Sequence, residues 1–340
     1  MKYLITGAAG FIGYNFVKSC NKRRIKTVSV DTPEAFARHQ DTSVFGSLVS
    51  RDHLPMWLYN SKTDLKLDAI IHLGACSDTT ELDAAYLAKV NSGYSQQLWE
   101  YCTYNKIPFI YASSAATYGS GRHGYSDNPA DLHKLRPMNL YGKSKHEFDL
   151  WATDGDNYGF CPPRWIGFKF FNVYGSGEEH KGKMASIVYQ FYHQIRETGK
   201  VKLFKSENPS YANGYQARDF IYVQDIVRVL QWAASPKNTN LQRGIFNLGT
   251  GVARSYLDVA WAVFKAMKKN PAIEFVDMPK ELIGQYQYFT QADMDRLKSI
   301  HPALDFFTLE QGVRKYVKEM DNKPCPPTPS SDILVVNPEQ

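Results

Sequence analysis

The sequence predicts an α/β protein built on a doubly wound parallel sheet, with a smaller C-terminal lobe. Short apolar runs alternate with helix-like segments through the first half of the chain, and a glycine-rich turn directly follows the first run. Continuous apolar strands separated by helices are typical of parallel sheets, because both faces of such sheets are buried. With 340 residues, of which 43% are apolar, the chain can bury a core of this size.

Strands are expected at apolar runs that turn residues bound. In chain order the candidates are YLIT (3–6), TVSV (27–30), AIIHLGA (69–75), FIYASS (109–114) and IGFKFFNVYG (166–175). Between these runs, stretches of amphipathic or mixed pattern predict helices around 11–22, 82–104 and 141–153.

Beyond about residue 176 the alternation weakens, because loops lengthen and helical patterns are interrupted. We therefore expect a sheet domain over residues 1–175, with a later returning segment around 218–250. Residues 176–322 are expected to form mainly the smaller lobe, and 323–340 a proline-rich tail.

Charge and cysteine content narrow the classes of function. The net charge is +6, but lysines and arginines are dispersed rather than concentrated as in nucleic-acid-binding proteins. The five cysteines form no CxxC pair and no metal-ligand spacing, so we expect reduced thiols in a cytoplasmic protein and no metal site. With no signal peptide and no run of ~18 apolar residues, no membrane association is expected.

The stretch TGAAGFIG places Gly7, Gly10 and Gly13 after the first strand, where a helix opens. Such glycines let the backbone approach a pyrophosphate, which the helix N-terminus attracts. Asp31, after the second strand, can bind the ribose hydroxyls of an adenosine. A glycine turn that serves only strand–helix packing is the alternative interpretation. The combined pattern predicts a Rossmann domain that holds NADP or NAD, one per subunit.

The choice between the two cofactors stays open. Asp31 favours NAD, because the 2′-phosphate of NADP would meet a like charge. Arg38 and Arg51 could pair with that phosphate, unless they are ordinary surface arginines.

A second group of residues suggests redox chemistry. In NLYGKSK, Tyr141 and Lys145 lie at positions i and i+4, so a helix places them on one face. A phenol has a pKa near 10, and a neighbouring cation lowers it toward the range of a general base. Ser114, at the end of the FIYASS strand, can hold the oxygen of a reacting alcohol. The alternatives are a hydroxyl that caps the strand end and a tyrosine in a helix interface.

With these residues in view, the chain resembles the extended short-chain dehydrogenase/reductases that act on nucleotide sugars. TGAAGFIG, SSAATYG, YGKSK, FFNVYG and RDFIYVQDI carry this resemblance over roughly residues 1–260. A closer resemblance, over about residues 1–320, is to the ADP-L-glycero-D-manno-heptose 6-epimerase family. It is carried by HLGACSDTTE, YASSAATYG, HKGKMAS, FNLGTG and QYQYFTQADM.

The resemblance implies an NAD(P)-binding Rossmann domain, a small substrate-binding domain and an isomerase that inverts C6 of ADP-glycero-manno-heptose. The C6 hydroxyl would be oxidised by bound NADP or NAD, and the ketone then reduced on its other face. The implied partners are a small-molecule nucleotide sugar and further copies of the chain in a homo-oligomer, with no nucleic acid or membrane.

The resemblance also assigns residues. Ser114, Tyr141, Lys145 and Lys181 would be catalytic, with Tyr141 and Lys181 as the two acid/bases. The cofactor-binding residues would be Gly7, Gly10, Phe11, Ile12, Gly13, Asp31, Arg38, Leu73, Gly74, Ala75, Cys76, Asn91, Tyr141, Lys145 and Val173. The substrate-binding residues would be Ser77, Asn172, Lys181, Lys183, Gln190, Phe204, Lys205, Ser206, Arg218 and Tyr286.

Inversion at C6 requires a second acid/base on the opposite face of the substrate. A nicotinamide returns hydride from a fixed position, so inversion requires the ketone to present its opposite face. Its oxygen then points away from Tyr141, and another donor must protonate it. Burial or a neighbouring cation, with Lys183 and His180 as candidates, would lower the pKa of Lys181 for this role. A solvated turn lysine is the alternative interpretation.

Departures from the family pattern lie on the substrate side. Lys183 replaces a serine, Gln190 replaces a histidine, and the 204–218 loop is longer. They leave the sugar open, so a C4 epimerase or another oxidoreductase acting on a UDP-, GDP- or dTDP-linked sugar is the alternative. A dehydratase is disfavoured because SSAATYG holds no acid pair. A redox-sensing binding module without turnover is disfavoured because Ser114, Tyr141 and Lys145 are all present.

Overall fold

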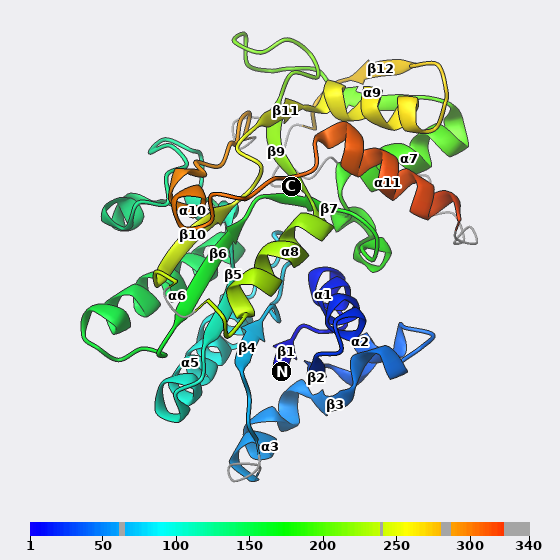
Figure 1. The fold of residues 1–340 in the computed structure, drawn as a ribbon. Coiled ribbons are helices and arrows are strands. Elements are labelled where there is room, and N and C mark those ends of the chain that lie inside the picture. The colour runs from blue at the N-terminus through cyan, green and yellow to red at the C-terminus, as the bar shows by residue number, and fades with distance from the viewer. Residues whose placement is uncertain (61–64, 239–240, 280–286, 323–340) are drawn as a thin grey trace. The chain divides into compact units, whose positions relative to one another are not determined.

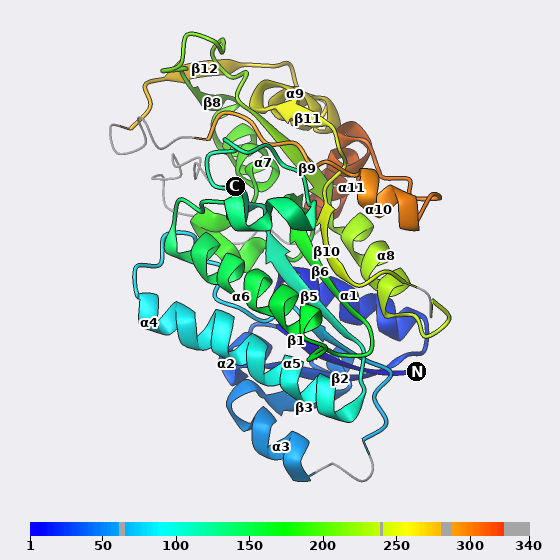
Figure 2. The ribbon, with the colours of Figure 1, turned by 90° about the vertical axis from the view of Figure 1, so that its left-hand side faces the viewer.

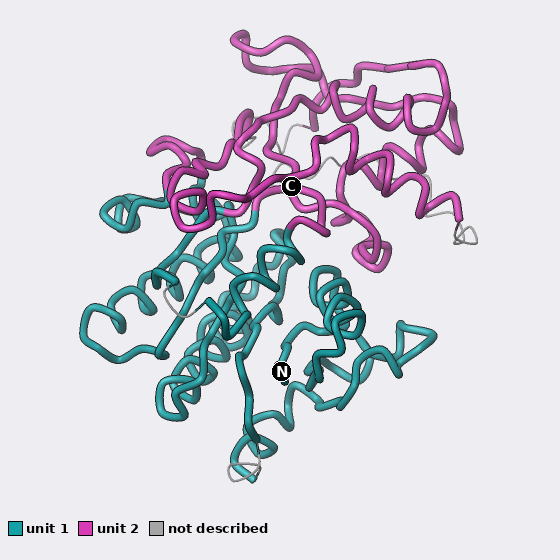
Figure 3. Tube along the Cα trace, viewed as in Figure 1, with its two compact units in different colours: residues 1–119, 127–170, 226–247 teal, residues 120–126, 171–225, 248–340 magenta. Residues whose placement is uncertain are grey.

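The computed structural model describes residues 1–60, 65–238, 241–279 and 287–322 (Figure 1). Tyr286 and the 323–340 segment, both subjects of sequence predictions, lie outside the described residues. The chain forms two compact units, shown in teal and magenta in Figure 3. Unit 1 comprises residues 1–119, 127–170 and 226–247, and unit 2 comprises the described residues of 120–126, 171–225 and 248–340.

A seven-stranded sheet forms the centre of unit 1. Its strands are β1 (Lys2–Thr6), β2 (Lys26–Asp31), β3 (Ser47–Ser50), β4 (Ala69–His72), β5 (Phe109–Ser114), β6 (Trp165–Phe170) and β10 (Gly244–Leu248). Their spatial order is β10-β6-β5-β4-β1-β2-β3, and every pairing from β6 to β3 is parallel. The predicted doubly wound parallel α/β fold is confirmed.

The helices of unit 1 are α1 (Phe11–Lys22), α2 (Pro33–Ala37), α3 (Leu54–Asn60), α4 (Ala84–Leu87), α5 (Tyr94–Asn105), α6 (Leu140–Asn157) and most of α8 (Val223–Ala234). Figures 1 and 2 show α4, α5 and α6 against one face of the sheet, and α1 and α8 against the other. Both faces are therefore covered, which explains why β4 and β6 are apolar runs buried along their whole length.

An aromatic cluster fixes α5 and α6 on the sheet. The Trp99 ring of α5 packs edge-on against Trp165 of β6, with ring centroids 5.0 Å apart. Phe148 of α6 packs edge-on against Tyr111 of β5, with centroids 4.9 Å apart. Edge-to-face aromatic pairs add to the free energy gained from burial. The cluster therefore fixes where α6, which carries Tyr141 and Lys145, lies on the sheet.

The β3 segment and the segments 82–104 and 166–175 differ from the sequence prediction. The strand β3 was not predicted, because its four residues, SLVS, are too short to show a period. The helix expected over 82–104 consists of α4, a π-helical turn (Ala88–Gly93) and α5. The strand expected over 166–175 divides at Phe171 into β6 and β7 (Asn172–Tyr174), which belong to different sheets.

In unit 2 a three-stranded sheet has the order β11-β9-β7, with β9 (Ala217–Tyr222) and β11 (Ala253–Ser255). A second sheet pairs β8 (Val201–Phe204) with β12 (Ile273–Val276). Its helices are α7 (Ile187–Thr198), α9 (Tyr256–Ala266), α10 (Asp295–Ile300) and α11 (Leu309–Asp321). Helix α9 packs against both α7 and α11.

Candidate functional site

The glycine turn after β1 is held in a conformation that only glycine suits. Gly7 has φ +66°, and a Cβ at this position would lie 2.6 Å from the backbone N of Gly74. Gly10 is the N-cap of α1 and supplies no side chain to its first turn. A backbone cradle at an uncapped helix N-terminus fits the pyrophosphate of a dinucleotide.

Asp31 lies at the end of β2, next to this cradle. Its Oδ2 accepts a hydrogen bond of 2.9 Å from the backbone N of Ala9, and its Oδ1 accepts one of 2.9 Å from Thr32. Burial raises the pKa of Asp31, while these hydrogen bonds and then the charges of Arg38 and Arg51 act to lower it. The fixed carboxylate is placed to accept hydrogen bonds from ribose hydroxyls, and the two arginines are near enough to act on it.

A hydrogen-bonded chain that sequence reasoning missed connects the cradle to α5. The backbone N of Gly74 donates to Thr6 Oγ1 over 3.1 Å, and Thr6 Oγ1 contacts His72 Nδ1 at 2.6 Å. On the other side of the ring, His72 Nε2 lies 2.8 Å from Ser95 Oγ, which donates to the carbonyl of Asn91. A neutral His72 ring protonated on Nε2 therefore satisfies both hydroxyls, because Thr6 can donate to Nδ1 and Nε2 can donate to Ser95. Burial accordingly lowers the pKa of His72 to about 3.

Asn91, buried in the π-helical turn, links the loop after β4 to α6. Its Oδ1 accepts from the backbone N of Cys76 over 2.8 Å, and its Nδ2 donates to the carbonyl of Cys76 over 3.0 Å. The same Nδ2 lies 3.0 Å from Ser144 Oγ, which donates to the carbonyl of Tyr141 over 2.8 Å. π-helical turns often occur at functional sites. This one joins the expected cofactor loop to the helix turn that carries Tyr141.

The Gly13→Ala variant is expected to bind nicotinamide cofactor more weakly. A Cβ at Gly13 would lie 2.0 Å from the carbonyl oxygen of Gly7, so the cradle must shift. Overpacking costs about 1–3 kcal/mol, so we expect a Kd raised about tenfold or more. Titration with cofactor, followed by nicotinamide fluorescence, measures this. Gly93→Ala is the control, because its Cβ would meet Ala88 at an ordinary 3.4 Å. Equal Kd values for both variants would contradict the assignment of the cradle.

Ser114, Tyr141 and Lys145 come together in unit 1, at the carboxyl end of β5 and the first turns of α6. Asn139 caps α6 by accepting a hydrogen bond of 2.6 Å from the backbone N of Gly142, which fixes the first turn. The Tyr141 side chain lies near enough to Ser114 for hydrogen bonding between them to act on the pKa of Tyr141. Lys145 donates to the carbonyl of Ala112 over 3.0 Å. The structure therefore brings these three predicted catalytic residues into one place.

Burial dominates the proton affinities here. It raises the pKa of Tyr141, and the hydrogen bond with Ser114 acts in the opposite direction. It also lowers the pKa of Lys145 to about 8, while Asp149 and then Cys76 act to raise it. The pKa of Tyr141 thus moves away from neutrality, opposite to the lowering by a neighbouring cation that the sequence predicted, because burial outweighs the other effects. The pKa of Lys145 moves toward neutrality, the direction that suits proton exchange near pH 7.

Lys181 lies in unit 2, in the 3₁₀-helical segment Glu179–Met184. Burial lowers the pKa of Lys181, and the charge of Glu178 opposes this shift. The charged group that acts on Lys181 is thus an anion, rather than the cations Lys183 and His180 that the sequence suggested. Glu178 is fully buried and accepts from Ser186 Oγ over 2.6 Å and from the backbone N of Gly175 over 3.2 Å.

The remaining predicted residues around this segment differ in exposure. Lys183 is exposed. Gln190 is buried, and its Nε2 donates to the carbonyl of Ala185 over 2.9 Å, which ties α7 to the segment. Asn172 and Val173 lie half-buried on β7.

Other predicted substrate-binding residues of unit 2 lie at the end of β8, in the loop directly after it, and on β9. Phe204 is buried at the end of β8, and Lys205 is exposed with its Nζ 2.8 Å from Asp277. Ser206 donates from Oγ to the carbonyl of Asn208 over 2.8 Å. Arg218 of β9 is 1% exposed, with its guanidinium 5.7 Å from the centre of the Tyr256 ring.

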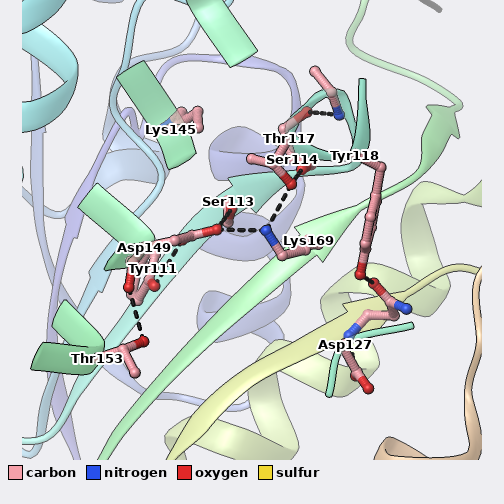
Figure 4. Close-up of polar contacts among 12 residues, drawn as sticks. Tyr111, Ser113, Ser114, Thr117, Tyr118, Asp127, Lys145, Asp149, Thr153 and Lys169 are labelled. Atoms are coloured by element: carbon pink, nitrogen blue, oxygen red, sulfur yellow. Dashed lines mark hydrogen bonds and ion pairs between the residues drawn. The ribbon is translucent and has the colours of Figure 1, made fainter. Parts of the chain in front are cut away.

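Two further residues of the site were missed in the sequence. Asp149 and Lys169 form an ion pair of 2.6 Å, with side chains 0% and 1% exposed (Figure 4). One signal was available for each: Asp149 lies at i+4 from Lys145 on the predicted helix, and Lys169 is a charge within an apolar strand. Neither signal identifies the partner.

No helix among the described residues has both the length and the apolar character needed to cross a membrane. In the same residues, no group of three or more His, Cys, Asp or Glu side chains could hold a metal ion.

Comparisons with known proteins agree with this geometry. Residues 3–249 match the model of the NAD dependent epimerase/dehydratase family. A protein of Fusobacterium nucleatum named ADP-L-glycero-D-manno-heptose-6-epimerase is 41% identical over 329 residues, covering 93% of this chain and 96% of its own. One of the same name from Nitratidesulfovibrio vulgaris is 43% identical over 322 residues, covering 93% and 97%.

A solved structure is also similar. The crystal structure of Helicobacter pylori ADP-L-glycero-D-manno-heptose-6-epimerase aligns with a TM-score of 0.76 at 26% identity, covering 95% of this chain and 96% of that one. The resemblance inferred from the motifs is confirmed, and the cofactor class that goes with it is a nicotinamide dinucleotide. The chain belongs to the NAD dependent epimerase/dehydratase family.

Proposed function

We propose that this protein is a nucleotide-sugar epimerase that inverts C6 of ADP-glycero-manno-heptose. The observation that carries the proposal is the grouping of Ser114, Tyr141 and Lys145 in unit 1, beside a cradle suited to a dinucleotide. The names of relatives at 41% and 43% identity support the choice of substrate.

Each catalytic residue has a distinct part in this proposal. The bound nicotinamide would take hydride from C6 of the sugar and return it. Tyr141 would remove the proton from the C6 hydroxyl, and Ser114 would hold that oxygen. Lys145, cationic and bound to the carbonyl of Ala112, would stabilise the negative charge that develops.

Inversion requires protonation on the other face of the ketone, and we assign this step to Lys181. The lowered pKa of Lys181 supports the assignment, because a lysine closer to neutrality exchanges protons more readily. Unit 1 would bind the cofactor and unit 2 mainly the substrate, through residues that include Asn172 and Arg218.

A product assay on a panel of nucleotide sugars tests the proposed function. We expect the purified protein to interconvert the two C6 epimers of ADP-glycero-manno-heptose, which NMR of the product distinguishes. The Lys145→Met variant serves as the inactive control. Turnover of a UDP-, GDP- or dTDP-linked sugar, without turnover of either ADP-heptose epimer, would replace the proposed substrate with the alternative one.

The same preparation identifies the cofactor. Asp31 favours NAD, whereas Arg38 and Arg51 supply the cations that the 2′-phosphate of NADP requires. Denaturation followed by chromatography separates NAD from NADP. The same measurement gives the number of cofactors per chain, which we expect to be one.

A further inference from the structure

A network of buried polar groups lies behind Ser114 and Lys145, and the mechanism above does not use it. At its centre is the ion pair between Asp149 of α6 and Lys169 of β6 (Figure 4). The Oδ1 of Asp149 accepts from the Tyr111 hydroxyl over 2.9 Å, and its Oδ2 accepts from Ser113 Oγ over 2.7 Å and Lys169 Nζ over 2.6 Å. The carboxylate therefore has three donors.

Asp149 fixes the part of β5 to which Lys145 binds. Its two hydroxyl donors, Tyr111 and Ser113, are the residues on either side of Ala112. The carbonyl of Ala112 is the acceptor for Lys145 Nζ. Asp149 thus holds the strand both before and after the group that positions Lys145.

Lys169 fixes the end of the same strand. It lies directly beside Ser113 in the parallel pairing of β5 with β6. Its Nζ donates to Thr117 Oγ1 over 2.6 Å, and Thr117 Oγ1 donates to the carbonyl of Ser114 over 2.8 Å. The turn that carries Ser114 is thereby tied to the buried lysine.

Stability alone gives no reason for this pair. Removing two charges from water is costly, and replacing a buried ion pair by apolar residues is often neutral or stabilising. A carboxylate here has a different effect, because Asp149 lies one helical turn from Lys145 and attracts its cation.

We propose that Asp149 and Lys169 are positioning residues for the reaction proposed above, and that their ion pair holds Ser114 and Lys145 in place. This inference rests on the proposed function. Asp149 has the further role of keeping Lys145 in its cationic form during that reaction. Neither residue contacts the reacting atoms; both act through Ser114 and Lys145.

Two variants separate positioning from stability. Asp149→Asn removes one charge and leaves Lys169 without its counter-ion, so we expect a lower Tm and a kcat reduced about tenfold or more. The double variant Asp149→Leu/Lys169→Met replaces both charges with apolar side chains. We expect its Tm to return to near the wild-type value, with kcat still reduced and KM little changed. Recovery of kcat together with Tm would show a purely structural role and overturn the proposal.

Arg164→Met is the matched control. Arg164 is a buried cation just before β6, at the end of the strand away from Lys169, and it donates to the carbonyls of Ser235 and Asn238. We expect this variant to lower Tm without reducing kcat. An equal reduction of kcat in this control would show that any loss of buried charge slows the enzyme, and would overturn the proposal.

A readout without substrate distinguishes this inference from the proposed function. NMR of lysine labelled with ¹³C at Cε follows the titration of Lys145, whose signal the Lys145→Met variant identifies. The groups that face Lys145 are Asp149 on its own helix, Cys76 and His72 from the β4 side, and the Ala112 carbonyl of β5. Loss of the Asp149 charge should move the titration midpoint to lower pH in both Asp149 variants.

The outcomes are separable. An unchanged midpoint overturns the proposal, whatever the substrate. A lowered midpoint in a protein that turns over no nucleotide sugar refutes the proposed function and supports the effect of Asp149 on Lys145. In an active protein, a lowered midpoint with unchanged kcat overturns the positioning role.

Discussion

The Tyr141→Phe variant is expected to lose at least ~10²-fold in the rate of epimerisation, the usual scale for a general acid/base. The substitution removes the hydroxyl beside Ser114 and leaves the ring in place. Because α6 is capped by Asn139 and held by Ser144 through backbone contacts, we expect its fold to be kept. Initial rates with each C6 epimer, together with the cofactor content, measure the effect.

Tyr158→Phe is a matched control for this experiment. Tyr158 follows α6 directly and is 88% exposed, so the same chemical change there should leave the rate unchanged. If Tyr141→Phe kept the wild-type rate with its cofactor bound, Tyr141 would not be the acid/base. Equal losses in both variants would point to a defect of the helix instead.

The Lys181→Met variant is expected to divide the reaction into its two halves. Tyr141 can still accept the proton from one epimer, so that epimer should reduce the bound cofactor in a single turnover. The other epimer requires a base on the opposite face and should not react. Overall epimerisation should fall at least ~10²-fold. Absorbance of the reduced nicotinamide after rapid mixing with each epimer measures the two halves.

Lys200→Met is the control for this second variant. Lys200 lies in the same unit and is exposed, with its Nζ 4.0 Å from Oε2 of Glu274. Removing its charge should leave both half-reactions intact. Full epimerase activity in Lys181→Met would refute the mechanism with two acid/bases. If the rates of both half-reactions fell by the same factor, Lys181 would instead be assigned to substrate binding.

Local sequence patterns predicted the central strands and the first helix of unit 1. Apolar runs bounded by turn residues located β1, β2, β4, β5 and β6 to within a few residues, and the pattern of residues 11–22 matched α1 (Phe11–Lys22). The glycine spacing predicted a cradle in which Gly7 and Gly13 have no room for a side chain. The i, i+4 spacing of Tyr141 and Lys145 placed them one turn apart on α6. Each of these features depends on residues close together in the chain, and so could be predicted from the sequence.

The supporting groups could not be predicted in this way. His72 reads as one residue of an apolar strand, yet its ring joins Thr6 of β1 to Ser95 of α5. Lys169 is a single charge within an apolar run of the sequence, which does not reveal that it is buried against Asp149. Partners this far apart in the chain depend on which strands become neighbours.

The sequence by itself determined the fold class, the dinucleotide cradle and the positions of Ser114, Tyr141 and Lys145 in the chain. Only the tertiary structure decided the proton affinities of these groups and the network that holds them. Burial of the Lys145 side chain between α6 and β5 sets its pKa, and the pairing of β5 with β6 brings Lys169 to Asp149. The physical reason is that solvation and electrostatic interaction depend on distance in space, which strand order and helix packing establish.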